Sequence, residues 1–178
     1  KSNRQCMTPM WTKSNRQCMT PHVVTPHVDK EAVVQLFEKI RTSFPNLEMR
    51  LDAEPRGVDL AMDIPQQHGL SFPVHVSLQG DELHLEAGAF WLEWFPCSEK
   101  FISDTFLNAV TGVLSGRFRI VEYYRGDKAI KSELQEPRDD DWKTIGTWSC
   151  LHLPFPLRKT MKILHNAQQD ARTNRAPR

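Results

Sequence analysis

The stretch FPVHVSLQGDELHLEAGA, residues 72–89, decides the fold. Apolar and polar residues alternate on both sides of Gly80-Asp81, and a two-residue loop that starts with glycine is typical of a tight β-hairpin. Pairing Gln79 with Glu82 brings the apolar residues of the two strands opposite one another, so that one face is wholly apolar. The sequence therefore predicts an antiparallel hairpin with one buried face and one polar face.

Hydrophobic periodicity and capping residues place the other elements around this hairpin. Apolar residues at helical spacing predict helices over 29–44, 98–115 and 156–166, and alternation predicts strands within 47–92, 117–135 and 142–150. Because hairpins link neighbouring strands, we expect an α+β fold with a single antiparallel sheet. The expected order is α-β-β-β-β-α-β-β-β-α, with the helices packed mainly on one face of the sheet.

A second tight turn is expected at Gly126-Asp127. Pairing Arg125 with Lys128 places Glu122 opposite Lys131, which is a favourable cross-strand charge pair. The two like charges beside the turn leave a longer loop as the alternative.

The two ends of the chain differ from the body. Residues 1–9 and 13–21 both read KSNRQCMTP, an exact duplication with almost no apolar periodicity. We interpret residues 1–28 as a duplicated, disordered segment or an expression scar, residues 29–166 as one α+β domain, and residues 167–178 as a polar basic tail.

Charge and composition exclude several classes of protein. The whole chain carries a formal net charge of +1, but its ends are basic, which leaves the predicted domain acidic. An acidic surface repels phosphate backbones, so we expect no nucleic-acid partner. No run of about 20 apolar residues occurs, so we expect no membrane partner either.

The cysteines and motifs favour a cytoplasmic protein without enzymatic activity. Cys6, Cys18, Cys97 and Cys150 lack zinc-type spacing, and no apolar signal-peptide core is present. Cys97 lies at a predicted helix N-terminus, where a thiol can become nucleophilic, but no partner base stands out and a structural role is the alternative. No glycine-rich phosphate loop, GxSxG or HExxH motif occurs, so we expect no cofactor.

The polar face of the first hairpin offers a metal-site hypothesis. In the expected register His75 lies opposite Glu86, and Ser77 lies opposite His84. Two imidazoles and a carboxylate on adjacent strands have the chemistry of a metal site, so His75, His84 and Glu86 are the candidate ligands. The alternative is the ordinary solvated side of a hairpin.

Aromatic residues suggest a second kind of site. The run FWLEWFPC, residues 90–97, crosses both faces of a strand, so part of it must meet another element, a subunit or a ligand. Core packing under a covering helix is the alternative. The candidate residues for ligand or partner binding are Trp91, Trp94, Phe95, Arg119, Tyr123 and Trp148.

The element order of residues 29–166 resembles that of class I type III secretion chaperones and YbjN-like proteins, which run helix, three strands, helix, two strands, helix. The resemblance implies a small, acidic, dimeric bacterial protein of the cytoplasm that binds extended protein segments in hydrophobic grooves. The chain departs from this order by a fourth strand before the second helix and by the strand at 142–150.

The leading hypothesis is therefore a chaperone-like or adaptor-like binding protein that uses an aromatic apolar groove. We expect a homodimer formed through helix 98–115 or the aromatic strand. The alternative is a small enzyme or ligand-binding domain whose cavity lies between sheet and helices. Its expected lining is Trp91, Trp94, Arg119, Tyr123 and Trp148. A metal protein that uses His75, His84 and Glu86 is the third hypothesis.

Overall fold

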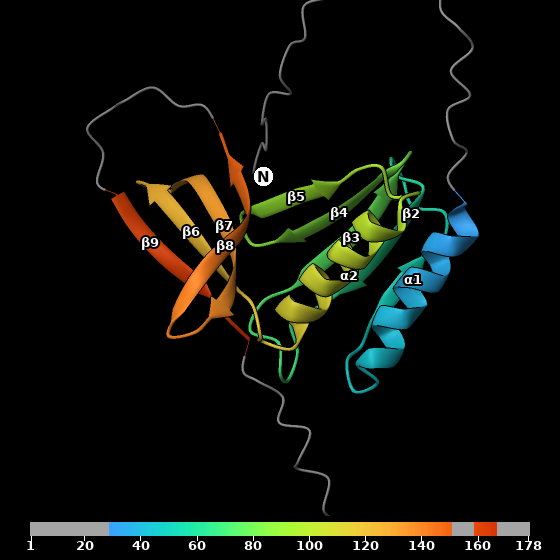
Figure 1. Cartoon of the computed structure of the whole chain (residues 1–178), viewed down its shortest axis with the longest axis horizontal. Coiled ribbons are helices and arrows are strands. Elements are labelled where there is room, and N and C mark those ends of the chain that lie inside the picture. The colour runs from blue at the N-terminus through green and yellow to red at the C-terminus, as the bar shows by residue number, and fades with distance from the viewer. Residues whose placement is uncertain (1–28, 151–158, 167–178) are drawn as a thin grey trace, which may run out of the picture.

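Two helices cover one face of a five-stranded antiparallel sheet, and a four-stranded antiparallel sheet packs beside strand β5 at its edge (Figure 1). The computed structural model describes residues 29–150 and 159–166. The α+β class is confirmed, but the expectation of a single sheet is wrong. In the described residues the elements are α1 (Lys30–Ser43), β1 (Arg50–Asp52), β2 (Leu60–Ile64), β3 (Val74–Gln79), β4 (Glu82–Ala87), β5 (Phe90–Trp94), α2 (Lys100–Leu114), β6 (Arg119–Arg125), β7 (Lys128–Arg138), β8 (Asp141–Ser149) and β9 (Lys159–Leu164).

The first sheet has the order β1-β2-β3-β4-β5 and carries the core on its helix side. Asp29 caps α1 by accepting a hydrogen bond from the Glu31 backbone N–H at 3.1 Å. Helix α1 buries one apolar stripe on the sheet, and Phe37 stacks on Phe106 of α2 with ring centroids 6.3 Å apart. The two helices are therefore held together by the same core that holds the sheet.

The register of the β3–β4 hairpin is confirmed. Gln79 pairs with Glu82, and Val76 pairs with Leu85, as alternation predicted. Gly80 begins the turn with φ of 60°, which favours glycine because it has no Cβ. One hairpin face is thus buried under the helices, and the other faces away from them.

A hairpin that the sequence did not predict follows directly. The chain turns at Gly88-Ala89 and returns as β5, in which Phe90 and Trp94 are buried in the core and Trp91 and Glu93 are exposed. The aromatic run therefore alternates between the two faces of an edge strand.

The second sheet has the order β8-β7-β6-β9, and bulges bend it. Arg125 pairs with Lys128 as expected, but a register shift between Tyr123 and Tyr124 places Ser132, instead of Lys131, opposite Glu122. An extra residue in one strand increases the local twist and turns the ribbon. We attribute the separation into two sheets to this twist, together with the α2 connection.

The third expected helix is also wrong where the structure describes it. Lys159–Leu164 forms strand β9, which pairs antiparallel with β6, and residues 151–158 lie outside the described residues. Pairing satisfies the backbone groups along the β6 edge, and alternation buries Leu164 while Ile163 stays exposed. The segments 1–28 and 167–178 lie outside the described residues as well. Within the described residues, neither helix is long and apolar enough to cross a membrane.

Candidate functional site

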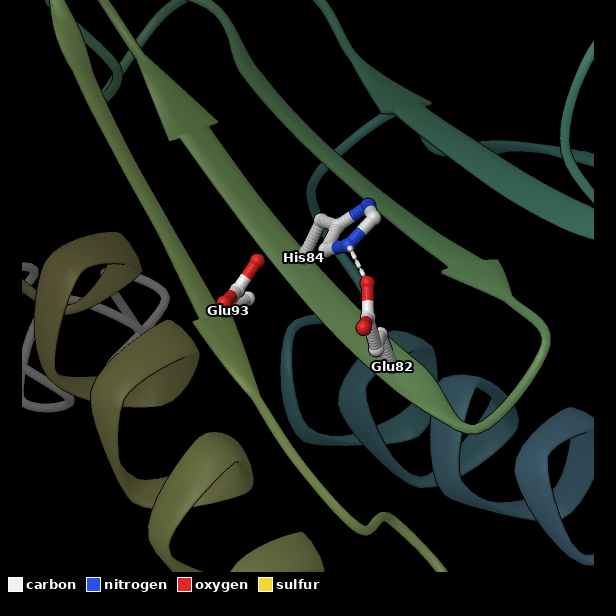
Figure 2. Close-up of side chains that lie close together, drawn as sticks. All are labelled: Glu82, His84 and Glu93. Atoms are coloured by element: carbon white, nitrogen blue, oxygen red, sulfur yellow. Dashed lines mark hydrogen bonds and ion pairs between the residues drawn. The ribbon is translucent and has the colours of Figure 1, made fainter. Parts of the chain in front are cut away.

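The face of the first sheet that points away from the helices carries a row of polar side chains at its centre. His84 of β4 lies directly opposite Ser77 of β3 on one side and Glu93 of β5 on the other. Glu82 lies two residues before His84 and so projects from the same face of β4. Figure 2 shows Glu82, His84 and Glu93 grouped together, with Glu82 bonded to the imidazole.

His84 is buried among these neighbours, with only 6% of its surface exposed. Its Nε2 lies 3.4 Å from Glu82 Oε2, and its Nδ1 lies 3.5 Å from Ser77 Oγ. The indole of Trp91 packs against the imidazole with ring centroids 5.4 Å apart. The ligand atoms of Glu82, His84 and Glu93 all lie within 4.8 Å of one another, and no other group of three such side chains does so in the described ranges.

The structure gathers a different set from the one expected for a metal. His84 belongs to it, but the His75 Nδ1 atom lies 2.6 Å from Asp63 Oδ1 on strand β2. Glu86 pairs across the sheet with His75 and Trp91 and does not join the group. The same-face spacing of Glu82 and His84 could have been recognised in the sequence, whereas the position of Glu93 depends on the β4–β5 turn.

A second feature is a cleft between the N-terminal halves of α1 and α2, with a volume of about 460 Å³. Its apolar side chains come mainly from one face of α1 and from the segment that leads into α2. The lining residues are Asp29, Ala32, Val33, Gln35, Leu36, Lys39, Cys97, Ser98, Lys100 and Ser103. This volume lies within the range of binding sites, which is about 300–1,000 Å³.

Cys97 sits in the wall of this cleft and is not activated as a nucleophile. Burial, together with the neighbouring Asp81 carboxylate, raises the pKa of the Cys97 thiol to about 12. The thiol is therefore protonated at neutral pH, and thiolate chemistry is disfavoured.

The aromatic candidates do not form one site. Trp94 lies in the core, where its ring meets Phe106 edge to face with centroids 5.4 Å apart. Trp91 points away from the core and covers His84. Phe95 is 61% exposed and lies in the connection to α2.

The remaining candidates lie in the second sheet. Arg119 stacks over the ring of Trp142 at 4.2 Å and donates a hydrogen bond to Gln135. Tyr123 donates a hydrogen bond to Glu133 on the same face as Arg119. Trp148 is half-buried and lies on the opposite face, because it pairs with Ser132, whose hydroxyl faces the first sheet. The lining expected for a cavity between sheet and helices is therefore not assembled.

The network around Tyr123 is satisfied internally. Burial and the hydrogen bond to Glu133 raise the pKa of Tyr123. Burial alone would raise the pKa of Glu133, but hydrogen bonds from Lys131 and Tyr123 outweigh it and lower that pKa. Glu133 is thus held as a carboxylate by its neighbours, which is the pattern of a structural ion-pair network.

Comparison with protein-family models, curated proteins and solved structures finds no match for this chain. The roles of its residues therefore rest on the geometry described above.

Proposed function

We propose that this protein binds a segment of another protein, in a chaperone-like or adaptor-like role, through the cleft between α1 and α2. The observation that carries the proposal is the cleft itself, whose wall contains the apolar side chains of Ala32, Val33, Leu36 and Cys97. A groove between two helices is a recurring docking place for an amphipathic segment that inserts apolar side chains.

Exposed aromatic residues close in sequence to the cleft wall support a protein partner. Phe95 and Phe101 flank, in the chain, the stretch 97–100 that contributes to the cleft wall, and they are 61% and 76% exposed. Large exposed apolar side chains are typical of an interaction surface.

The charges at the rim suggest the chemistry of the partner segment. Lys100 is paired with Asp104 at 2.5 Å, whereas Lys39 forms no ion pair within the described residues. An acidic residue next to an apolar anchor would complement Lys39. We therefore expect the bound segment to combine a large apolar side chain with a neighbouring Asp or Glu.

A matched pair of alanine-to-glutamate variants tests this function. Ala32 lines the cleft and is exposed, so Ala32→Glu should fill the apolar space with a charge without disturbing the core. Ala53→Glu makes the same substitution at an exposed position in the loop after β1 that does not line the cleft. A displayed library of short apolar-acidic peptides, screened against the natural protein, provides the probes.

The selected peptides should bind the Ala53→Glu variant as they bind the natural protein. They should lose about tenfold or more of their affinity for Ala32→Glu, because an unpaired charge would be buried against the anchor. Equal binding to both variants, or a screen that selects no peptide, would contradict the proposal.

A further inference from the structure

We propose that Glu82, His84 and Glu93 form a binding site for one divalent transition-metal ion, for which Zn²⁺ is the probe. The site is independent of the proposed cleft, because these residues lie on the face of the first sheet away from the helices, whereas the helices form the cleft.

The backbone register fixes the arrangement of the ligands. Glu82 and His84 project from the same face of β4, and Glu93 lies directly across from His84 on β5. All three come from two hydrogen-bonded strands of one sheet, and neighbouring strands hold facing side chains about 5 Å apart at Cβ. The rigid part of the site is therefore built before any ion binds.

The distances fit a tetrahedral ion. Zinc bonds of about 2.0–2.2 Å to nitrogen and oxygen place two ligand atoms of a tetrahedral site about 3.3–3.6 Å apart. The His84 Nε2 atom and the Glu82 Oε2 atom already lie 3.4 Å apart. The Glu93 carboxylate lies within 4.8 Å of both, and its exposed side chain can close the rest by rotation.

The surroundings of His84 orient it for coordination. Ser77 Oγ faces Nδ1 at 3.5 Å, which leaves Nε2, the nitrogen near the two carboxylates, as the metal-binding atom. The indole of Trp91 packs against the ring and limits its rotation. A polar partner on the second nitrogen and an apolar shell are the usual supports of a metal-binding histidine.

Charge also favours a cation between the three side chains. An N–H group at His84 Nε2 can donate one hydrogen bond, to Glu82, and so it neutralises none of the charge of Glu93. A divalent ion interacts with both carboxylates and the imidazole at once. One nitrogen and two carboxylates favour a transition ion over Mg²⁺ or Ca²⁺, which prefer oxygen ligands alone.

The experiment is a Zn²⁺ titration of the full chain, followed by isothermal calorimetry and by intrinsic tryptophan fluorescence, to which Trp91 contributes. His84→Gln and Glu93→Gln each remove one ligand. His75→Gln and Glu86→Gln are the matched controls, because they change the same residue types on the same sheet face outside the group. Cysteines and histidines elsewhere in the chain bind Zn²⁺ equally in the natural protein and in the ligand variants. The difference in Zn²⁺ affinity between the natural protein and a ligand variant therefore reports this site alone.

We expect the natural protein and both controls to bind an ion that the His84→Gln and Glu93→Gln variants bind about tenfold more weakly or not at all. Mg²⁺ and Ca²⁺ should not compete. The thermal midpoints of all variants without metal show whether each is folded. Ser77→Ala, which keeps all three ligands, should weaken binding by a smaller factor. Equal Zn²⁺ affinity in the natural protein and both ligand variants, or no saturable binding at all, would overturn the proposal.

Discussion

At the scale of single residues, two glycines with almost the same backbone conformation have different surroundings. Gly80 and Gly88 each begin a tight turn, with φ of 60° and 61°. A Cβ on Gly80 would meet nothing within 4 Å, whereas a Cβ on Gly88 would overlap Glu122 Oε1 and lie 2.6 Å from Leu164 Cδ1. Gly88 is therefore required for packing as well as for conformation.

We predict that Gly80→Ala lowers the free energy of unfolding by about 1 kcal/mol, which is the cost of a left-handed conformation. Gly88→Ala should cost about 2–3 kcal/mol more, because Glu122 is buried and cannot move away freely. Urea denaturation of both variants measures the difference. Equal destabilisation would show that the close approach to Glu122 does not constrain this turn.

Cys97 provides a second residue-scale prediction. With a pKa of about 12, its thiolate fraction at neutral pH is about three orders of magnitude below that of a free cysteine. Iodoacetamide should therefore leave Cys97 unmodified in the folded chain and modify it after unfolding in urea, as peptide mass mapping can measure. Rapid modification of the folded protein would contradict this environment.

The same shift of the pKa has a consequence for stability. Folding raises the pKa of the Cys97 thiol from 9.0, so the neutral thiol contributes to the free energy of unfolding. This contribution is complete below about pH 9. It is lost as the pH rises from 9 towards 12, because in this range the Cys97 thiol ionises in the unfolded chain but stays neutral in the folded chain. Tyr124, whose pKa burial and Glu122 raise to about 12, adds a loss of the same sign above its ordinary value of 10.

At the scale of elements, the final strand gives the clearest contrast between sequence and structure. The helix expected over 156–166 would bury Met161 and Leu164 on one stripe. In strand β9 Leu164 is buried, whereas Met161 is 60% exposed. A short stretch with apolar residues at both spacings does not distinguish the two, and pairing with β6 decides in favour of the strand.

We predict that Leu164→Ala lowers the free energy of unfolding by about 2–4 kcal/mol, because it removes a buried side chain from the core. Met161→Ala should cost less than about 1 kcal/mol. Thermal or urea denaturation of the two variants provides the measurement. Comparable losses for both variants would favour the helical arrangement instead.

Local turn chemistry explains which elements were predictable. The Gly80-Asp81 hairpin follows from alternation on both sides of a glycine-first loop, and its register is confirmed. Gly88-Ala89 has the same pattern, but the aromatic run after it suggested a continuous strand. One of the three residues of the candidate metal group, Glu93, was missed with this turn, because the turn alone brings Glu93 beside His84.

Local sequence patterns do not predict long-range packing. The bulge that shifts Glu122 from Lys131 to Ser132 depends on the twist of the whole ribbon. The α1–α2 cleft depends on how two helices separate on the sheet, which no spacing within either helix specifies. Cys97 was recognised at a helix start, but its burial beside Asp81 is a tertiary property.

At the scale of the whole molecule, the two sheets meet at the β4–β5 turn. The Ala89 backbone N–H donates a hydrogen bond to Glu122 at 2.5 Å, and Ser132 Oγ donates one to the Ala89 carbonyl at 3.3 Å. Tyr124 donates a further bond to Glu122 at 2.8 Å. One buried carboxylate therefore joins a turn of the first sheet to β6 of the second, which fixes the sheets as one unit.

The prediction that the protein forms a homodimer through α2 or β5 concerns the molecule as a whole. The solvent side of α2 exposes Phe101, and β5 leaves part of Trp91 exposed beside His84, so each element offers an apolar side chain to a partner. A stable interface of about 1,200–2,000 Å² needs such anchors at its centre. Light scattering after size exclusion should give twice the chain mass, and a strict monomer would contradict the prediction.

Charge substitutions then locate the interface. Phe101→Glu should yield a monomer if α2 forms it, and Trp91→Glu should do so if β5 forms it. Ile145→Glu is the control, because Ile145 of β8 is exposed to the same degree as Trp91, at 37%, but lies in the second sheet. A charge in the centre of an apolar interface is buried without a partner and separates the subunits, whereas the same charge on β8 stays in water. Dissociation by Ile145→Glu alone would place the interface on the second sheet instead.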